Sequence, residues 1–169
     1  MADQVAVSHD VTKLVEKIKD IKIAMMTTIE KGSELHSRPM YTSEPEEDGT
    51  LWFFTEQDSQ KVDELQQDRH VNLGYADPSA NTYVAINGTA QVVTDRAKIK
   101  ELWSEGLRGW CPKGSDDPNI ALLRVTIDKG EFWDSPNSTL LRAYTYAKAV
   151  VTGERDQPGP DRQSVVIPS

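Results

Sequence analysis

The sequence is poor in cysteine, in long apolar runs and in basic charge. Its single cysteine, Cys111, excludes an internal disulfide and favours the reducing cytoplasm. No apolar run approaches the length of a membrane span, and the first residues lack the basic and apolar segments of a signal peptide. The 27 acidic residues outnumber the 19 Lys and Arg, which gives a formal net charge of -8. Because nucleic-acid binding needs a basic patch, we expect a cytoplasmic protein that binds neither nucleic acid nor a membrane.

Metal-ligand and nucleotide-binding motifs are also missing. His9, His36 and His70 are far apart in the sequence, and Cys111 has no partner at metal-ligand spacing, so the sequence predicts no metal site. We interpret Cys111 as a packed residue rather than a catalytic thiol. The chain contains neither a glycine-rich dinucleotide fingerprint nor a P-loop, so Rossmann-type nucleotide binding has no support.

The apolar pattern predicts one mainly β domain with a few helices. Apolar spacing of three and four residues predicts a helix over residues 10–20, and further helices are expected over 59–67 and after Asp95. Six strand-like stretches joined by short turns favour an antiparallel barrel, with Gly88 as a β-bulge in the fifth. Those stretches are residues 21–29, 35–41, 51–55, 71–76, 81–93 and 121–134, the last as one strand or a pair. We expect an N-terminal extension over 1–10, the domain over 11–153 and a disordered tail over 154–169.

The stretch from 51 to 65 predicts a strand that passes directly into a helix. Asp58 or Ser59 is placed to cap the helix, and Lys61 lies in its first turn. A cation is unfavourable there, because the first turn carries the positive end of the helix dipole. A phosphate held by the free backbone N–H groups, the Ser59 hydroxyl and the Lys61 ammonium would turn that penalty into an attraction. The alternative is a solvated Lys61 and a Ser59 that only caps the helix.

Arg38 is a second candidate anion ligand. In a strand it shares one face with His36 and Met40, and it precedes Pro39, which places this strand at an edge, at an interruption or beside a ligand. If that face is buried, the guanidinium needs a partner, and both an acidic side chain and a phosphate would supply one. Arg38, Ser59 and Lys61 together form a candidate site for one anion. The aromatic residues are more typical of a core than of cofactor stacking.

Seven short motifs carry a resemblance to a known family. The chain resembles the pyridoxamine 5'-phosphate oxidase-like split barrels that bind flavin mononucleotide (FMN), and within them the general stress protein branch, from about residue 11 to residue 153. The motifs are Ile23-Ala-Met-Met-Thr-Thr28, Leu35-His-Ser-Arg-Pro-Met40, Leu51-Trp-Phe-Phe-Thr55, Ser59-Gln-Lys61, Val71-Asn-Leu-Gly-Tyr75, Gly88-Thr-Ala90 and Glu131-Phe-Trp-Asp134.

The resemblance implies a six-stranded antiparallel split β-barrel that forms a homodimer, with FMN (or FAD) in two clefts between the subunits. Arg38, Ser59 and Lys61 match the residues that hold the flavin phosphate in the family. Trp133 matches a tryptophan that comes from the other subunit, and Trp110 would close the cleft. The residues expected to line the isoalloxazine ring with their backbone are Arg38, Pro39, Met40, Phe53, Phe54 and Thr55.

Two departures from the family pattern limit the expected activity. Gln60 stands where true pyridoxamine phosphate oxidases carry a second basic residue, and residues 134–139 replace an arginine-containing substrate motif. Both argue against pyridoxamine phosphate oxidation. The leading hypothesis is a flavin-dependent oxidoreductase of the stress response, with no catalytic side chain identified. The alternatives are a non-catalytic flavin-binding or storage module and a split barrel that binds FAD, a deazaflavin or heme.

Overall fold

The computed structural model describes residues 9–134, 150–151 and 161–166. For residues 9, 10 and 161–165 it describes the backbone. None of the helices in these ranges has the length and apolar character needed to cross a membrane.

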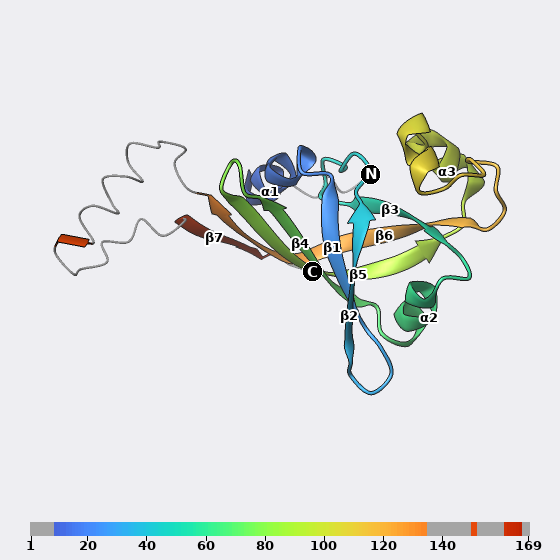
Figure 1. The fold of residues 1–169 in the computed structure, drawn as a ribbon, viewed down its shortest axis with the longest axis horizontal. Helices are drawn as coiled ribbons and strands as arrows, with labels where there is room; N and C mark the ends of the chain where they lie inside the picture. Colours follow the sequence, from blue (N-terminus) through green and yellow to red (C-terminus); the bar gives the residue numbers. More distant parts are fainter. Residues whose placement is uncertain (1–8, 135–149, 152–160, 167–169) are drawn as a thin grey trace, which may run out of the picture.

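An antiparallel sheet forms the body of the protein (Figure 1). Six strands follow the order β2-β1-β4-β5-β6-β3, and β7 pairs with β6 outside this path. In most of these strands, alternating apolar residues bury one face and expose the other, as antiparallel strands with one solvated face require. Strand β3 differs, because both of its faces are buried over residues 51–55. The strands are β1 (Ile23–Ile29), β2 (Leu35–Tyr41), β3 (Leu51–Glu56), β4 (His70–Asp77), β5 (Thr82–Val93), β6 (Ile120–Asp134) and β7 (Asp161–Val166).

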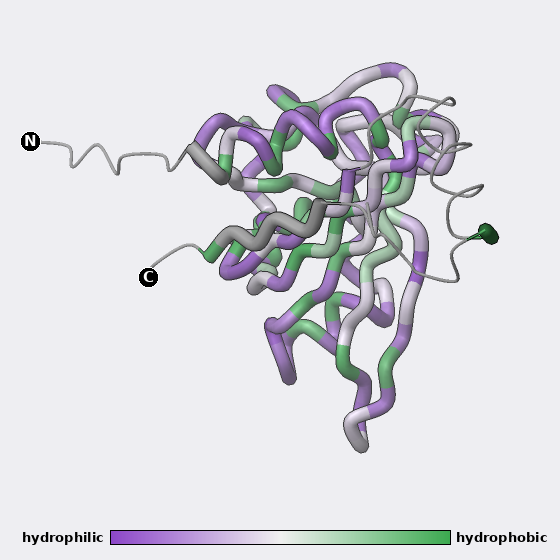
Figure 2. Tube along the Cα trace, turned by 90° about the vertical axis from the view of Figure 1, so that its left-hand side faces the viewer, coloured by the Kyte–Doolittle hydropathy of each residue, from purple (hydrophilic) through white to green (hydrophobic). Residues whose placement is uncertain are grey.

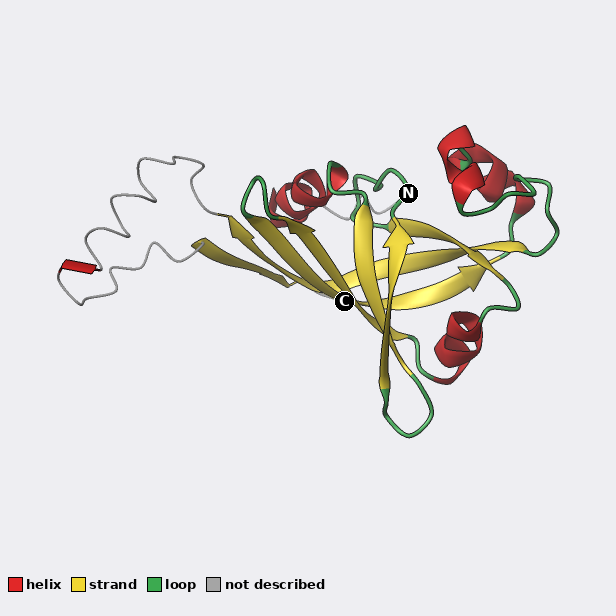
Figure 3. Ribbon diagram, viewed as in Figure 1, coloured by secondary structure: helices red, strands yellow, loops and turns green. Residues whose placement is uncertain are grey.

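The six-stranded sheet curls into a half-barrel, as Figure 3 shows. Its two edge strands, β2 and β3, meet at one isolated bridge between Thr42 and Phe53. A backbone hydrogen bond from Ser43 N to Trp52 O, 2.9 Å long, reinforces the bridge. The predicted mainly β barrel of six antiparallel strands is therefore confirmed, with β7 as an additional strand.

The helices lie around the rim of the half-barrel (Figure 1). Leu14 of α1 is fully buried and lies against Gly130 of β6, where a Cβ atom would come within 2.4 Å of the Leu14 side chain. The predicted cap of α3 is confirmed, because the Asp95 side chain accepts a hydrogen bond from Ala97 N. The helices are α1 (His9–Lys19), α2 (Gln60–Gln67), α3 (Arg96–Leu102) and the 3-10 helix η1 (Glu105–Gly109).

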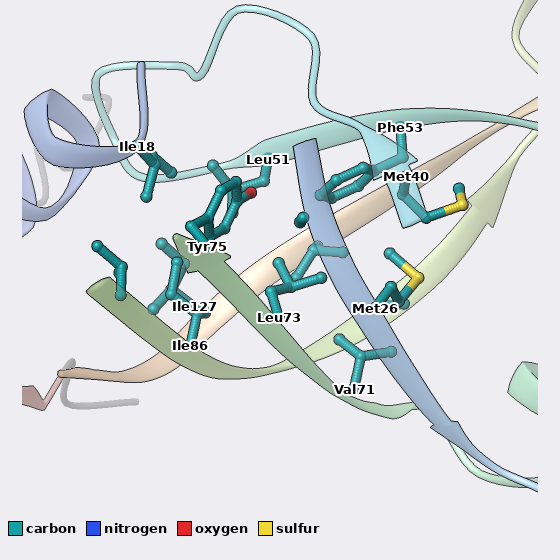
Figure 4. Packing of buried hydrophobic residues seen from close by; sticks show 14 of the residues in the cluster. Ile18, Met26, Met40, Leu51, Phe53, Val71, Leu73, Tyr75, Ile86 and Ile127 are labelled. Atoms are coloured by element: carbon teal, nitrogen blue, oxygen red, sulfur yellow. The ribbon is translucent and has the colours of Figure 1, made fainter. Parts of the chain in front are cut away.

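Two apolar clusters make up the core. Figure 2 shows hydrophobic and hydrophilic residues alternating along the strands, and Figure 4 shows the larger cluster inside the half-barrel. There Phe53 of β3 and Met40 of β2 lie near Met26 of β1, so the core continues across the two edge strands. The smaller cluster packs β3 and the start of β6 against α3 and η1, with Trp52, Phe54, Ile99, Leu107, Cys111, Ile120 and Leu122.

Strand register fixes which side chains share the outer face of the sheet. Met25 lies opposite Pro39 on β2 and opposite Gly74 on β4, so these residues point away from the core. The predicted separation of the two faces of β2 is confirmed, since Arg38 lies opposite the buried Met26. Exposed apolar side chains gather on the outer face, which we define by Ile23, Met25, Leu35 and Tyr83.

The prediction of a disordered tail over 154–169 is wrong for residues 161–166. They form β7, which pairs with β6 from Lys129 to Asp134. The other edge of β6 pairs with β5, and β3 covers β6 only over residues 120–125. Residues 161–166 therefore form a strand that pairs with the backbone groups of β6 that β3 leaves uncovered. The remainder of the predicted tail and most of the predicted extension lie outside the described residues.

Gly88 provides a test of how the long strands bend. The β5–β6 register shifts between Asn87 and Gly88, which confirms the predicted bulge. A Cβ atom at Gly88 would lie 2.3 Å from the backbone oxygen of Thr126. We expect Gly88→Ala to lower the free energy of unfolding by about 1–3 kcal/mol, the usual cost of overpacking, in urea denaturation. Gly109→Ala is the control, since its Cβ meets nothing within 4 Å. Equal stability of both variants would contradict this account.

Candidate functional site

Three polar side chains meet where β3 passes into α2. Lys61 Nζ donates a hydrogen bond of 3.2 Å to Thr55 Oγ1, and Ser59 Oγ lies 3.1 Å from the same oxygen. Ser59 occupies the N-cap position of α2, but its side chain makes no capping hydrogen bond. The prediction that Ser59 stands at the helix start is confirmed. Its hydroxyl is directed to Thr55 and leaves the first amides of α2 without a side-chain cap, which is the arrangement that favours a bound anion.

Lys61 carries its charge in an unfavourable setting. Burial lowers the pKa of Lys61, and the nearby positive charge of Arg38 lowers it further. Glu56 and Glu64 act in the opposite direction but do not compensate. A bound anion would relieve both the desolvation and the repulsion between the two cations. The electrostatics of Lys61 therefore fit an anion ligand better than a fully solvated ammonium.

Arg38 is held by an internal partner. Its Nη2 donates to Glu64 Oε2 at 2.8 Å, and its Nη1 donates to Thr28 Oγ1. The side chains of Arg38 and Glu64 are 15% and 4% exposed, so this is a nearly buried ion pair. The sequence allowed either an acidic side chain or a phosphate as the partner of Arg38. In the structure the partner is an acidic side chain, Glu64. The pair fixes one side of the guanidinium and leaves its remaining N–H groups as possible donors to an anion near Lys61.

Glu64 is the site residue that the sequence did not reveal. Burial alone raises the pKa of Glu64, but hydrogen bonds with Thr28, Arg38 and His36 outweigh it, so the pKa lies below its ordinary value. The carboxylate is thus the charged form in the fold. In the sequence it is one of several acidic residues near a short amphipathic helix. The one signal that could have revealed it is the apolar spacing of α2, which places Glu64 beside the buried Leu65.

The residues expected beside a flavin ring border a split in the sheet. Beyond the Thr42–Phe53 bridge, β2 pairs with β1 and β3 pairs with β6, but no ladder joins β2 to β3 within the described residues. Continuing the register of the bridge places Met40 across the split from Thr55. The side chains of Met40, Phe53 and Phe54 are buried in the two core clusters. A ligand in this split would therefore meet the backbone groups of β2 and β3 and the exposed Pro39.

The two tryptophans predicted at the site, Trp110 and Trp133, lie in different parts of the fold. Trp110 follows η1 and is 55% exposed, in the segment that also holds Cys111. Trp133 lies near the far end of β6, twelve residues beyond Ala121, which pairs with Thr55. At about 3.3 Å per residue, these twelve residues span roughly 40 Å of strand. Within one chain, Trp133 and the Thr55–Lys61 cluster thus lie at opposite ends of β6 (Figure 1).

Cys111 has the properties of a packed residue. Its side chain is buried in the smaller core cluster. Burial raises the pKa of the Cys111 thiol, with further contributions from Glu56 and Asp117. A thiol with a raised pKa is a poor nucleophile at neutral pH. The interpretation of Cys111 as structural agrees with this environment.

Together these features define an anion site on a split antiparallel barrel. Lys61, the Ser59 hydroxyl and the open start of α2 can bind a phosphate, with Arg38 beside them. The backbone edges of β2 and β3 can donate to and accept from the heteroatoms of a flat ring. The sequence profile of the pyridoxamine 5'-phosphate oxidase-like family matches residues 9–157. The chain therefore belongs to this family.

Individual relatives agree with that assignment. Protein bli-3 of Neurospora crassa is 28% identical over 156 residues, which cover 82% of this chain and 75% of bli-3. The general stress FMN/FAD binding protein of Xanthomonas citri is 29% identical, with a TM-score of 0.67 over 79% of this chain and 94% of that one. The general stress protein 26 of Bacillus anthracis str. Sterne shares the fold at 23% identity, with a TM-score of 0.61 over 70% and 92% of the two chains.

The Arg38–Glu64 pair is tested by Glu64→Gln. The substitution keeps the shape of the side chain but leaves the guanidinium nearly buried without a counter-charge, so we expect a loss of about 2–4 kcal/mol in the free energy of unfolding at pH 7. Glu105→Gln removes the exposed partner of Arg108 and is the control, with an expected change of less than about 0.5 kcal/mol. Urea denaturation measures both.

The same pair predicts a pH dependence. The folded-state pKa of Glu64 is below its ordinary value of 4.5. The stabilisation is therefore complete above pH 4.5 and is lost as the pH falls through the lower, folded-state value. The stability difference between wild type and Glu64→Gln should shrink over that acidic range. A difference that is constant from pH 7 to pH 3 would contradict the proposed charge pair.

Proposed function

We propose that this protein is a cytoplasmic, homodimeric flavoprotein that binds FMN and exchanges electrons between the flavin and a substrate. The observation that carries the proposal is the cluster of Thr55, Ser59 and Lys61 beside Arg38, at the mouth of the split between β2 and β3. The family supports a flavin, and the X. citri relative is described as an FMN/FAD binding protein. FMN is favoured because one phosphate matches one cluster of cations.

The chain's own residues fit the flavin phosphate. Lys61 is a partly desolvated cation with a second cation nearby, and a phosphate dianion would pair with both. The uncapped start of α2 adds backbone donors directed at the same position. Glu64 holds Arg38 in place, so the guanidinium loses little freedom on binding. The site is thus organised before the ligand arrives.

The redox chemistry would come from the flavin, which takes up and releases electrons once bound. The protein's residues position the ring, exclude water from one face and set the local charge. The buried Met40 and Phe53 make the sheet behind the split apolar. The exposed Trp110 precedes Cys111, which interacts electrostatically with Lys61, so Trp110 would cover part of the mouth. No side-chain acid or base is required for hydride exchange, because positioning alone supplies much of the rate.

The outer face of the sheet supports the proposed homodimer. Ile23, Met25, Leu35 and Tyr83 are exposed large apolar residues, and Met25 is 46% exposed. A hollow of about 480 Å³ lies on the same face between Leu35 and Asn72. Trp133 lies opposite Tyr83 in the β5–β6 register, so it borders this face too. A second copy packed on this face would cover these apolar residues. The Trp133 of that copy would then lie at the interface between the two subunits.

The phosphate clamp is tested by comparing FMN with riboflavin, which lacks the phosphate. We expect Lys61→Ala and Arg38→Ala each to weaken FMN binding by about 1.5–3 kcal/mol, roughly 10- to 150-fold, in calorimetric titrations. Riboflavin affinity should change little. Lys100→Ala is the control, since Lys100 is exposed on α3 and pairs with Asp116. Equal losses for FMN and riboflavin, or no loss for either variant, would show that these cations do not bind the phosphate.

The dimer surface is tested by placing a charge on it. Met25→Glu introduces a carboxylate at the centre of the outer face, where burial against a second copy would desolvate it. We expect sedimentation velocity to show a dimer for wild type and a monomer for Met25→Glu, with unchanged circular dichroism. Gln66→Glu on the exposed side of α2 should remain dimeric. A Met25→Glu variant that stays dimeric would place the interface elsewhere.

A further inference from the structure

Three potential metal ligands meet beside the Arg38–Glu64 pair. Glu30 directly follows β1, His36 lies on β2 and Glu64 lies on α2, and their ligand atoms all fall within 4.8 Å of one another. Glu30 and His36 lie on either side of one hairpin turn, but 28 positions separate His36 from Glu64. Sequence spacing therefore gave no sign of the cluster, and the sequence predicted no metal site.

The distance between two of the ligands suits a small divalent ion. His36 Nδ1 lies 3.3 Å from Glu64 Oε1. In a tetrahedral zinc site with bonds of about 2.1 Å, neighbouring ligand atoms are about 3.4 Å apart. The pair is thus already spaced as two ligands of one ion. Glu30 directly follows β1, and its ligand atom lies within 4.8 Å of the other two.

Glu64 has one oxygen fixed and the other directed into the cluster. Its Oε2 accepts hydrogen bonds from Arg38 and from Thr28, whereas its Oε1 faces His36. Metal-binding carboxylates are commonly oriented by such hydrogen bonds from the surrounding shell. Gln60 Nε2 supports Glu30 in the same way, donating to Glu30 Oε1 at 3.1 Å. Both carboxylates are therefore held in position by residues outside the cluster.

Access also favours a cation. His36 is 43% exposed at its side chain, whereas Glu64 is buried, so the cluster opens to solvent on the histidine side. An ion held by one nitrogen and two carboxylate oxygens would keep a fourth position for water, as zinc sites with three protein ligands do.

We propose that Glu30, His36 and Glu64 bind one Zn²⁺ ion at the turn end of the β1–β2 hairpin. This site is separate from the flavin phosphate site and shares with it only the Glu64 carboxylate, whose Oε2 remains on Arg38. The ion replaces the His36–Glu64 hydrogen bond and links the hairpin to α2. It stabilises the fold around the split without taking the place of the phosphate.

The test is a calorimetric titration of ZnCl₂ into tag-free, full-length protein, with MgCl₂ as the comparison ion. We expect one Zn²⁺ per subunit, a rise in melting temperature with Zn²⁺ and none with Mg²⁺, because an imidazole ligand favours zinc. His36→Ala and Glu30→Gln should each weaken zinc binding by more than the roughly 10- to 100-fold that loss of an outer-shell partner costs.

His70→Ala is the matched control, since His70 is an exposed histidine that pairs with Asp68 outside the cluster. It should bind zinc as wild type does. Absence of zinc binding by wild type, or affinities that are unchanged in both His36→Ala and Glu30→Gln, would overturn the proposal. Glu30 is partly exposed and lies outside the core clusters, so Glu30→Gln decides the matter if His36→Ala fails to fold. FMN affinity measured in parallel reports on the flavin proposal independently, because neither substitution touches Lys61.

Discussion

The burial of Lys61 beside a second cation, Arg38, is the constraint on which the candidate site depends. Each would be ordinary on a solvated surface, but here burial lowers the pKa of Lys61 and the charge of Arg38 lowers it again. Glu64 pairs with Arg38 in a nearly buried ion pair, and together with Glu56 it offsets the lowered pKa of Lys61 only in part. A bound anion would stabilise an ammonium in this setting. The partly desolvated ammonium beside a second cation, rather than any single hydrogen bond, makes the start of α2 a candidate phosphate site.

The sheet topology explains why Lys61 lies beside the split between β2 and β3. The strand order places β2 and β3 at the two edges of the curled sheet, and they meet at a single bridge. Their backbone edges beyond the bridge are available to a ligand, while their side chains close the core behind it. The same curl sends β6 away from the site, so Trp133 ends on the outer face beside Tyr83. In the flavin cleft that we propose, Trp133 would therefore come from a second copy of the chain.

Much of this arrangement could be predicted from the sequence, because local pattern determined it. Alternating apolar residues located the strands, Asp95 marked a helix start and Gly88 marked the bulge. Arg38 drew attention because a charge in a half-buried strand needs a partner. Glu64 was missed because nothing local distinguishes it from the other acids of α2, and its role appears only when α2 packs beside β1 and β2. Strand β7 was missed because it is short and mostly polar, and it pairs only where β6 leaves an edge uncovered.

The most direct test is whether the folded protein retains FMN. Purified protein is mixed with excess FMN, desalted, and examined by visible absorption alongside a sedimentation measurement of its mass. The account predicts about one FMN per subunit, retained by a dimer, with an absorption band shifted from that of free flavin by the apolar sheet behind the ring. A folded dimer that retains no flavin under these conditions would contradict the central claim and would leave the cations of Lys61 and Arg38 to a different phosphorylated ligand.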